Sequence, residues 1–207
     1  MTLDEALAEC PVVAIIRGVT PAEAVAHAEA LYAAGIRGVE VPLNSPDPLE
    51  SIQALSHAFS DRMVVGAGTV LRAEKVSQVA AMGGRIIVSP NVVTSVIGRA
   101  LSLHLDPAPG FATATEAFVA CDAGARHLKL FPAVTYGPAH MRQLKAVLPS
   151  EAVVWAVGGV GPKDFADWWA AGARAFGLGG ELYRAGQNPE QTFEKAKAVA
   201  DAAKALP

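Results

Sequence analysis

The sequence has little charge, few aromatic side chains and little cysteine. Only 18% of its 207 residues are Asp, Glu, Lys or Arg, 6% are aromatic, and two are cysteine. Its 17 basic residues do not outnumber its 20 acidic ones and they occur singly, which argues against a face that binds nucleic acid. Cys10 and Cys121 are more simply explained as reduced packing residues, with one disulfide bridge as the alternative.

The sequence also lacks a membrane segment and a signal peptide. Its uncharged apolar stretches fall far short of the roughly 20 residues that a spanning helix needs. Its first residues include Asp4, Glu5 and Glu9 in place of the basic start of a signal peptide. We therefore expect a cytoplasmic protein that makes no membrane contact. Because 52% of the residues are apolar and no linker interrupts them, we expect residues 1–207 to form one domain.

Short apolar runs recur along the chain, and each is followed by a turn and a segment of helical length. Their centres lie roughly 18 to 26 residues apart, which leaves room for one helix between neighbouring strands of a parallel sheet. Most runs are apolar on both faces, as in strands that are covered on both sides. The pattern predicts an α/β fold, a single compact (β/α)8 TIM barrel, with an open doubly wound sheet as the competing architecture. The runs are 12–16, 38–42, 63–66, 85–89, 103–105, 127–131, 153–157 and 175–178.

Two charged residues stand in the middle of predicted strands. Glu40 lies in the run 38–42 and Lys129 in the run 127–131, each between two apolar neighbours. Because side chains alternate along a strand, both charges should point into the barrel while their neighbours face the helices. Burial lowers the pKa of a lysine, and the neutral amine can form a Schiff base with a carbonyl substrate. The alternative is a buried ion pair with a purely structural role.

Two further features indicate anionic ligands at the carboxyl ends of the strands. Arg17 ends the first run, where we expect it to bind a carboxylate or a phosphate, with a solvated strand end as the alternative. Glycine-rich turns at 157–162 and 177–180 follow the last two runs. Glycine lets backbone N–H groups approach an anion, and a helix that starts just beyond adds its dipole, so we expect a phosphate cradle rather than plain tight turns. The five histidines show no metal-ligand spacing, so we expect no metal site.

Several ordered segments resemble a known family. They are AIIRG at 14–18, VEVPLNSP at 39–46, GAGTVL at 66–71, ATATEAF at 112–118 and AVGGV at 156–160. Together they resemble the class I pyruvate-lyase aldolases that cleave 2-keto-3-deoxy-6-phospho sugar acids, and within them the galactonate branch. The resemblance extends from about residue 12 to 187 and implies a lyase that needs no cofactor. It implies that Lys129 forms an imine with the substrate and that Glu40 is the general acid/base, giving pyruvate and glyceraldehyde 3-phosphate.

The resemblance also implies binding roles. Arg17 and Thr69 would hold the pyruvate carboxylate, although the Thr69 hydroxyl is equally typical of a turn or a helix start. Val157 stands where gluconate-type relatives have threonine, and Asn44 and Ser45 where they have arginine and threonine, so the preference at C4 of the substrate should differ. The family pattern suggests a homotrimer. Pro90 and Phe131 would shape the site. The phosphate would be held by Gly158, Gly159, Gly179 and Gly180.

Three alternatives to this function remain open from the sequence. The gluconate epimer is an alternative main substrate. A phosphate-binding barrel isomerase or epimerase would use Glu40 as its base and Lys129 as an electrophile. A barrel that only senses sugar phosphates would bind its ligand without turnover. Relatives commonly have serine where this chain has Gly180, so a hydroxyl donor to the phosphate is missing and unphosphorylated keto-deoxy acids become candidate substrates.

Overall fold

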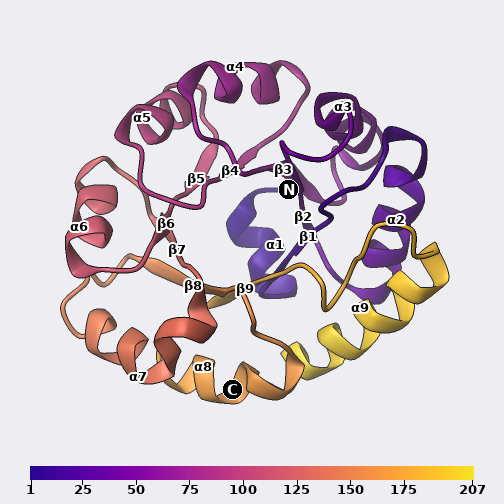
Figure 1. Cartoon of the computed structure of the whole chain (residues 1–207). Helices are drawn as coiled ribbons and strands as arrows, with labels where there is room; N and C mark the ends of the chain where they lie inside the picture. Colours follow the sequence, from indigo (N-terminus) through magenta and orange to yellow (C-terminus); the bar gives the residue numbers. More distant parts are fainter.

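The computed structural model describes all 207 residues and shows a ring of helices around a parallel sheet (Figure 1). The strands are β1 (Val12–Ile15), β2 (Gly38–Pro42), β3 (Val64–Gly68), β4 (Ile86–Val88), β5 (Asp106–Ala108), β6 (Gly110–Phe111), β7 (His127–Leu130), β8 (Val153–Val157) and β9 (Ala175–Leu178). The helices are α1 (Leu3–Glu9), α2 (Pro21–Ala34), α3 (Pro48–Phe59), α4 (Ala73–Ala81), α5 (Thr94–Ser102), α6 (Ala114–Asp122), α7 (Ala133–Lys145), α8 (Phe165–Ala170) and α9 (Pro189–Lys204), with a 3-10 turn at Pro162–Asp164. None of the helices is both long enough and apolar enough to span a membrane.

The sheet confirms the predicted barrel. Its strands follow the order β5-β4-β3-β2-β1-β9-β8-β7-β6, all neighbours are parallel, and no reversal of order occurs as in a doubly wound sheet. The two end strands, β5 and β6, are separated along the chain by Pro109 alone. β5 pairs with β4, β6 pairs with β7, and the carbonyl of Pro109 accepts a 2.9 Å hydrogen bond from the Lys129 N–H. The fifth strand of an eight-stranded barrel is therefore split in two.

The position predicted for that fifth strand was wrong. Residues 103–105 follow the end of α5 and form a turn, in which His104 has a positive φ of +57°. The strand lies just beyond, in the segment DPAPGF, where two prolines disguise it because a proline cannot donate a ladder hydrogen bond. Pro107 nevertheless lies opposite Ile87 of β4. The other seven predicted runs each coincide with a strand to within two residues.

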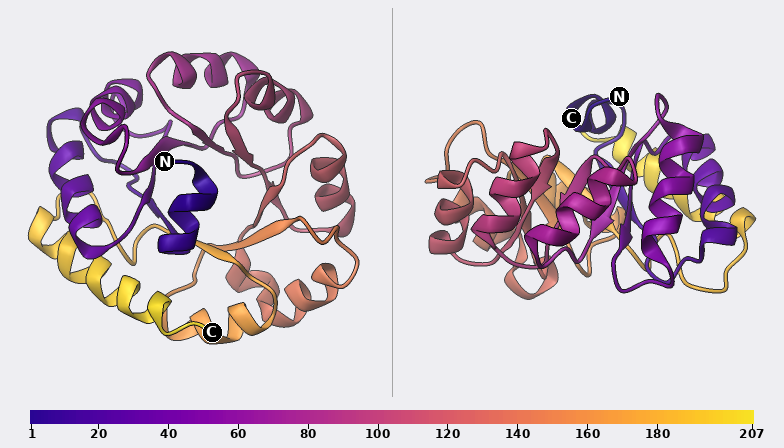
Figure 2. Two further views of the ribbon diagram at one scale, coloured as in Figure 1. Left: turned by 180° about the vertical axis from the view of Figure 1, so that it is seen from behind. Right: turned by 90° about the horizontal axis from the view of Figure 1, so that it is seen from above.

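Two separate apolar cores hold the barrel. The larger one fills the space between the strands and the surrounding helices. The smaller one fills the barrel interior and includes Leu3, Ala6 and Leu7 of α1 together with strand residues such as Val13 and Trp155. α1 lies across the amino end of the barrel and closes it (Figure 2). This helix was not predicted from the sequence, although Thr2 and Glu5 form a capping box at its start.

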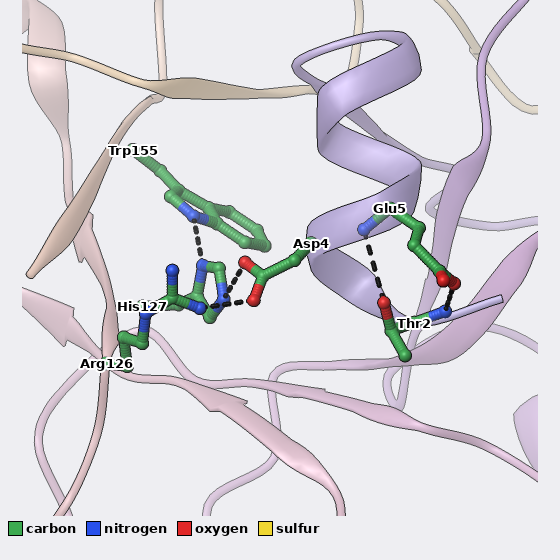
Figure 3. A network of polar contacts seen from close by, with 6 residues as sticks. All are labelled: Thr2, Asp4, Glu5, Arg126, His127 and Trp155. Carbon is green, nitrogen blue, oxygen red and sulfur yellow. Dashed lines mark hydrogen bonds and ion pairs between the residues drawn. The ribbon is translucent and has the colours of Figure 1, made fainter. Parts of the chain in front are cut away.

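Polar contacts attach α1 to the inside of the barrel (Figure 3). The Asp4 carboxylate pairs with Arg126 and lies 3.4 Å from Nε2 of His127. The indole Nε1–H of Trp155 donates to Nδ1 of His127 over 3.2 Å, so the imidazole hydrogen is on Nε2, facing Asp4. Burial lowers the pKa of His127 to about 4, with the Asp4 charge opposing that shift. The imidazole is therefore neutral at physiological pH.

This histidine should make folding stability depend on pH. The folded chain resists a proton that the unfolded chain accepts below the ordinary histidine pKa of 6.5, so stability falls as the pH drops from 6.5 towards 4. The loss over that window is about 3 kcal/mol. Denaturant unfolding of His127→Asn, whose side-chain carbonyl still accepts from Trp155, should show a flatter pH dependence. His57→Asn on the exposed face of α3 is the control, and equal slopes for the two variants would contradict this account.

Candidate active site

A cavity of about 530 Å³ opens at the carboxyl ends of the strands, opposite α1. All the residues singled out from the sequence for catalysis, carboxylate binding and phosphate binding line it, although they come from distant parts of the chain. The lining residues among that set are Arg17, Glu40, Thr69, Pro90, Lys129, Phe131, Val157, Gly158, Gly159, Gly179 and Gly180. The barrel therefore gathers one site from the ends of its strands, as parallel barrels do.

Glu40 is buried in the middle of β2 with 2% of its surface exposed. Its Oε2 atom has no hydrogen-bond partner. Burial raises the pKa of its carboxyl to about 7, and the positive charges of Lys129 and Arg17 oppose this rise. Glu40 can therefore both hold and release a proton near neutral pH.

Lys129 is buried in β7 with 7% of its surface exposed, opposite Trp155 of β8 in the strand register. Its Nζ atom lies 4.7 Å from the centre of the Phe131 ring. Burial lowers the pKa of the amine, Glu40 opposes the shift, and Arg17 adds to it. Lys129 and Glu40 form no ion pair within 4.0 Å, so the structural ion pair considered from the sequence is not formed.

Gly68 makes room for the Glu40 carboxyl, and the sequence analysis missed it. A Cβ atom on Gly68 would lie 2.0 Å from Oε2 and 2.4 Å from Oε1 of Glu40, far inside contact distance. The signal was present in the pattern Gly66-Ala67-Gly68, because glycine inside a strand marks a close approach of other atoms. The next residue, Thr69, has a φ of +57°, which is rare for a β-branched side chain and marks a strained backbone at the cavity.

Arg17 connects the ends of β1 and β2. Its guanidinium donates to the side-chain oxygen of Asn44, and the neighbouring Gly18 N–H donates to Oγ of Ser45 over 2.9 Å. Asn44 and Ser45, two of the positions expected from the sequence to differ from gluconate-type relatives, therefore hold the loop that carries Arg17. The guanidinium is exposed at the cavity mouth, where an anion can reach it.

The glycine turns line the cavity at the ends of β8 and β9, and β9 pairs with β1. Gly158 and Gly159 have φ values of +95° and +72°, a conformation that favours glycine, and a Cβ on Gly158 would lie 3.2 Å from the Phe131 ring. The predicted helix start is found after only one of the two turns. The 3-10 turn Pro162–Asp164 and α8 directly follow the first glycine turn, whereas α9 begins only at Pro189, well after Gly180.

The same side of the cavity holds three residues that the sequence analysis did not single out. They are Glu181, Tyr183 and Arg184, in the segment that directly follows the second glycine turn. Their place in the sequence could have identified them, because residues that directly follow a predicted phosphate-binding turn are expected to lie close to the same ligand.

A buried amine and a buried carboxyl in one barrel cavity, with glycine turns beside them, define an enzyme suited to carbonyl chemistry on a small anionic substrate. The sequence model of the KDPG and KHG aldolases matches residues 3–199. The chain belongs to this aldolase family and is a carbon–carbon lyase.

Three relatives show how near the match is. The 2-dehydro-3-deoxy-6-phosphogalactonate aldolase of Escherichia coli (strain K12) is 50% identical over 93% of this chain and 94% of its own. A solved structure described as native KDPGal has a TM-score of 0.92 and 49% identity, covering 94% of each chain. The KDPG aldolase of Legionella pneumophila has a TM-score of 0.84 at 26% identity, covers 94% of this chain and 96% of its own, and was solved with pyruvate captured as a covalent carbinolamine intermediate.

Replacing Gly68 by alanine should displace the Glu40 carboxyl. Aldolase kcat should fall about 100-fold, because a misplacement near 1 Å can cost that much in rate. Shortening the acid in Gly68→Ala/Glu40→Asp should recover part of the loss relative to Gly68→Ala. Gly98→Ala is the matched control, since Gly98 lies on the exposed side of α5 with no atom within 4 Å of the added Cβ. Full activity of a folded Gly68→Ala enzyme would contradict this role.

Proposed function

We propose that this protein cleaves 2-dehydro-3-deoxy-6-phosphogalactonate into pyruvate and glyceraldehyde 3-phosphate through an imine on Lys129. The observation that carries the proposal is the pairing of a buried amine with a buried carboxyl whose pKa is about 7, in one cavity and without an ion pair. The 50% identity to a protein named for this reaction supports the galactonate substrate over its gluconate epimer.

The reaction starts with the neutral Nζ of Lys129, which attacks the C2 carbonyl of the substrate and forms a carbinolamine. Loss of water, with a proton supplied by Glu40, leaves a protonated imine. The Glu40 carboxylate then takes the proton of the C4 hydroxyl as the C3–C4 bond breaks, and the bonding electrons move into the imine to give an enamine. Glyceraldehyde 3-phosphate leaves. Protonation at C3 and hydrolysis of the imine by one water release pyruvate and restore the amine.

The other cavity residues orient the substrate. Arg17 and Thr69 hold the carboxylate of the pyruvate half, while Pro90 and Phe131 shape the pocket around the reacting carbons. The N–H groups of the two glycine turns, Gly158 to Gly159 and Gly179 to Gly180, bind the phosphate. Two positions support this arrangement. Arg17 and Thr69 follow the carboxyl ends of β1 and β3, and the glycines lie at the carboxyl ends of β8 and β9.

The proposed working form is a cytoplasmic homotrimer in which residues 1–207 act as one catalytic unit. Support for the trimer comes from apolar side chains that are exposed on the neighbouring helices α5, α6 and α7. Exposed apolar patches are typical of subunit interfaces. The residues are Leu101, Phe118, Val119, Val134 and Tyr136.

Borohydride reduction in the presence of pyruvate tests the imine. We expect a covalent pyruvate adduct on Lys129 by peptide mass spectrometry, and no adduct in Lys129→Met. Lys145 is the internal control, because burial lowers the pKa of its amine too but it lies outside the cavity. A chelator should leave activity unchanged. An adduct on another lysine, or none, would overturn the proposed mechanism, and the absence of any adduct would favour a barrel isomerase or epimerase.

Val157 should set the preference at C4. Valine cannot hydrogen-bond a C4 hydroxyl, so the Val157→Thr change adds a donor on the inner face of β8. We expect the ratio of kcat/KM for the galactonate epimer to that for the gluconate epimer to fall about tenfold. Val147→Thr, at an exposed position outside the cavity, should leave the ratio unchanged. An unchanged ratio in a folded Val157→Thr enzyme would show that C4 is recognised elsewhere.

A further inference from the structure

Two opposite charges stand beside the glycine turns and have no part in the chemistry proposed above. Glu181 and Arg184 lie in the short segment between β9 and α9, and both line the cavity together with Gly179 and Gly180. Both side chains are exposed. A ligand that reaches the glycine turns therefore meets one positive and one negative side chain.

The backbone that carries Arg184 is held firmly on both sides. The N–H groups of Leu182 and Tyr183 donate to the Gly179 carbonyl over 2.8 and 2.9 Å, and both side chains are buried. The Tyr183 hydroxyl donates to Glu23 over 3.1 Å. On the other side, the Arg184 N–H donates to the Gln187 side chain over 3.1 Å. The arginine side chain therefore extends from a fixed base, which reduces the entropy lost when it binds an anion.

The Arg184 guanidinium itself has no partner. It makes no hydrogen bond or ion pair with the protein, whereas the other arginine of the cavity, Arg17, donates to Asn44. Its Nε atom lies 3.8 Å from the position that a Cβ would occupy on Gly180. Because Gly180 has no side chain, the space above it is open, and the guanidinium borders that space. Residue 180 offers no hydroxyl to an anion, and Arg184 is the nearest side chain that can donate.

Glu181 acts in the opposite direction. Its carboxyl carbon lies 3.5 Å from the position that a Cβ would occupy on Gly161, in the first glycine turn. The carboxylate makes no ion pair either. A phosphate dianion between the two turns is therefore attracted by Arg184 and repelled by Glu181, while an uncharged hydroxyl end of a substrate is little affected by either.

We infer that Arg184 binds the terminal phosphate of the substrate and that Glu181 limits this affinity, so the pair sets the preference for phosphorylated over unphosphorylated keto-deoxy acids. The inference rests on the proposed aldolase function and adds two residues to its substrate recognition. Arginine suits the role because its planar fork can make two charge-assisted hydrogen bonds to phosphate oxygens.

The test compares kcat/KM for 2-dehydro-3-deoxygalactonate with and without its 6-phosphate, using the full-length enzyme. In Arg184→Gln the ratio of phosphorylated to unphosphorylated substrate should fall about tenfold, mainly through KM for the phosphorylated acid. In Glu181→Gln the ratio should rise about threefold. Arg184→Lys should give an intermediate ratio, because it keeps the charge and loses the fork. Arg142→Gln is the matched control, an exposed and unpaired arginine on α7 outside the cavity, and should not change the ratio.

Binding of inorganic phosphate, followed by calorimetry, gives an independent readout. It should weaken in Arg184→Gln and tighten in Glu181→Gln, and added salt should reduce the difference between the wild type and Arg184→Gln. If the wild type cleaves both acids but Arg184→Gln keeps its substrate ratio and its phosphate affinity, the inference is wrong and the aldolase function stands. If the wild type cleaves neither acid, the proposed function fails, and the phosphate titrations still decide whether Arg184 and Glu181 control anion binding.

Discussion

The site depends on keeping water away from one amine and one carboxyl. Lys129 and Glu40 stand in the middle of strands whose other side is packed against helices, and the interior below them is filled by an apolar core that α1 closes. In that environment the charged form of each group is disfavoured, which lowers the pKa of the amine and raises that of the acid. The barrel thus holds a lysine and an acid suited to the proposed roles of nucleophile and proton carrier, without bringing them into an ion pair, which would hold both in their charged forms.

Strand β7 carries both a residue that binds α1 at the closed end of the barrel, His127, and the lysine of the cavity, Lys129. His127 and Lys129 are two residues apart on β7, so their side chains point to the same face and lie in successive layers of the interior. In the layer nearer the amino end, His127 contacts Asp4 of α1 and Trp155 of β8 (Figure 3). The layer nearer the carboxyl end holds the Lys129 amine. Packing at the amino end of the barrel therefore supports the position of Lys129.

Much of this arrangement could be predicted from the sequence, because the strong signals were local. Apolar runs at regular spacing gave the barrel, and a charge within a strand identified Glu40 and Lys129. The errors have physical causes. The split strand at 106–111 contains prolines, which are rare in strands, so the neighbouring apolar run 103–105 was chosen in its place. Gly68, Glu181 and Arg184 were missed because their local signals, a glycine inside a strand and a position after a glycine turn, do not show which side chains lie near them in space.

The strand order has a consequence for how the chain is made. β1 pairs with β2 on one side and with β9 on the other. One of the two partners of this early strand therefore begins only at Ala175. During synthesis on the ribosome, one edge of β1 stays without its partner until nearly all of the protein has emerged. An unpaired parallel edge can recruit a strand from another molecule. Chains that end before Ala175 therefore carry an aggregation hazard that pairing with β9 removes.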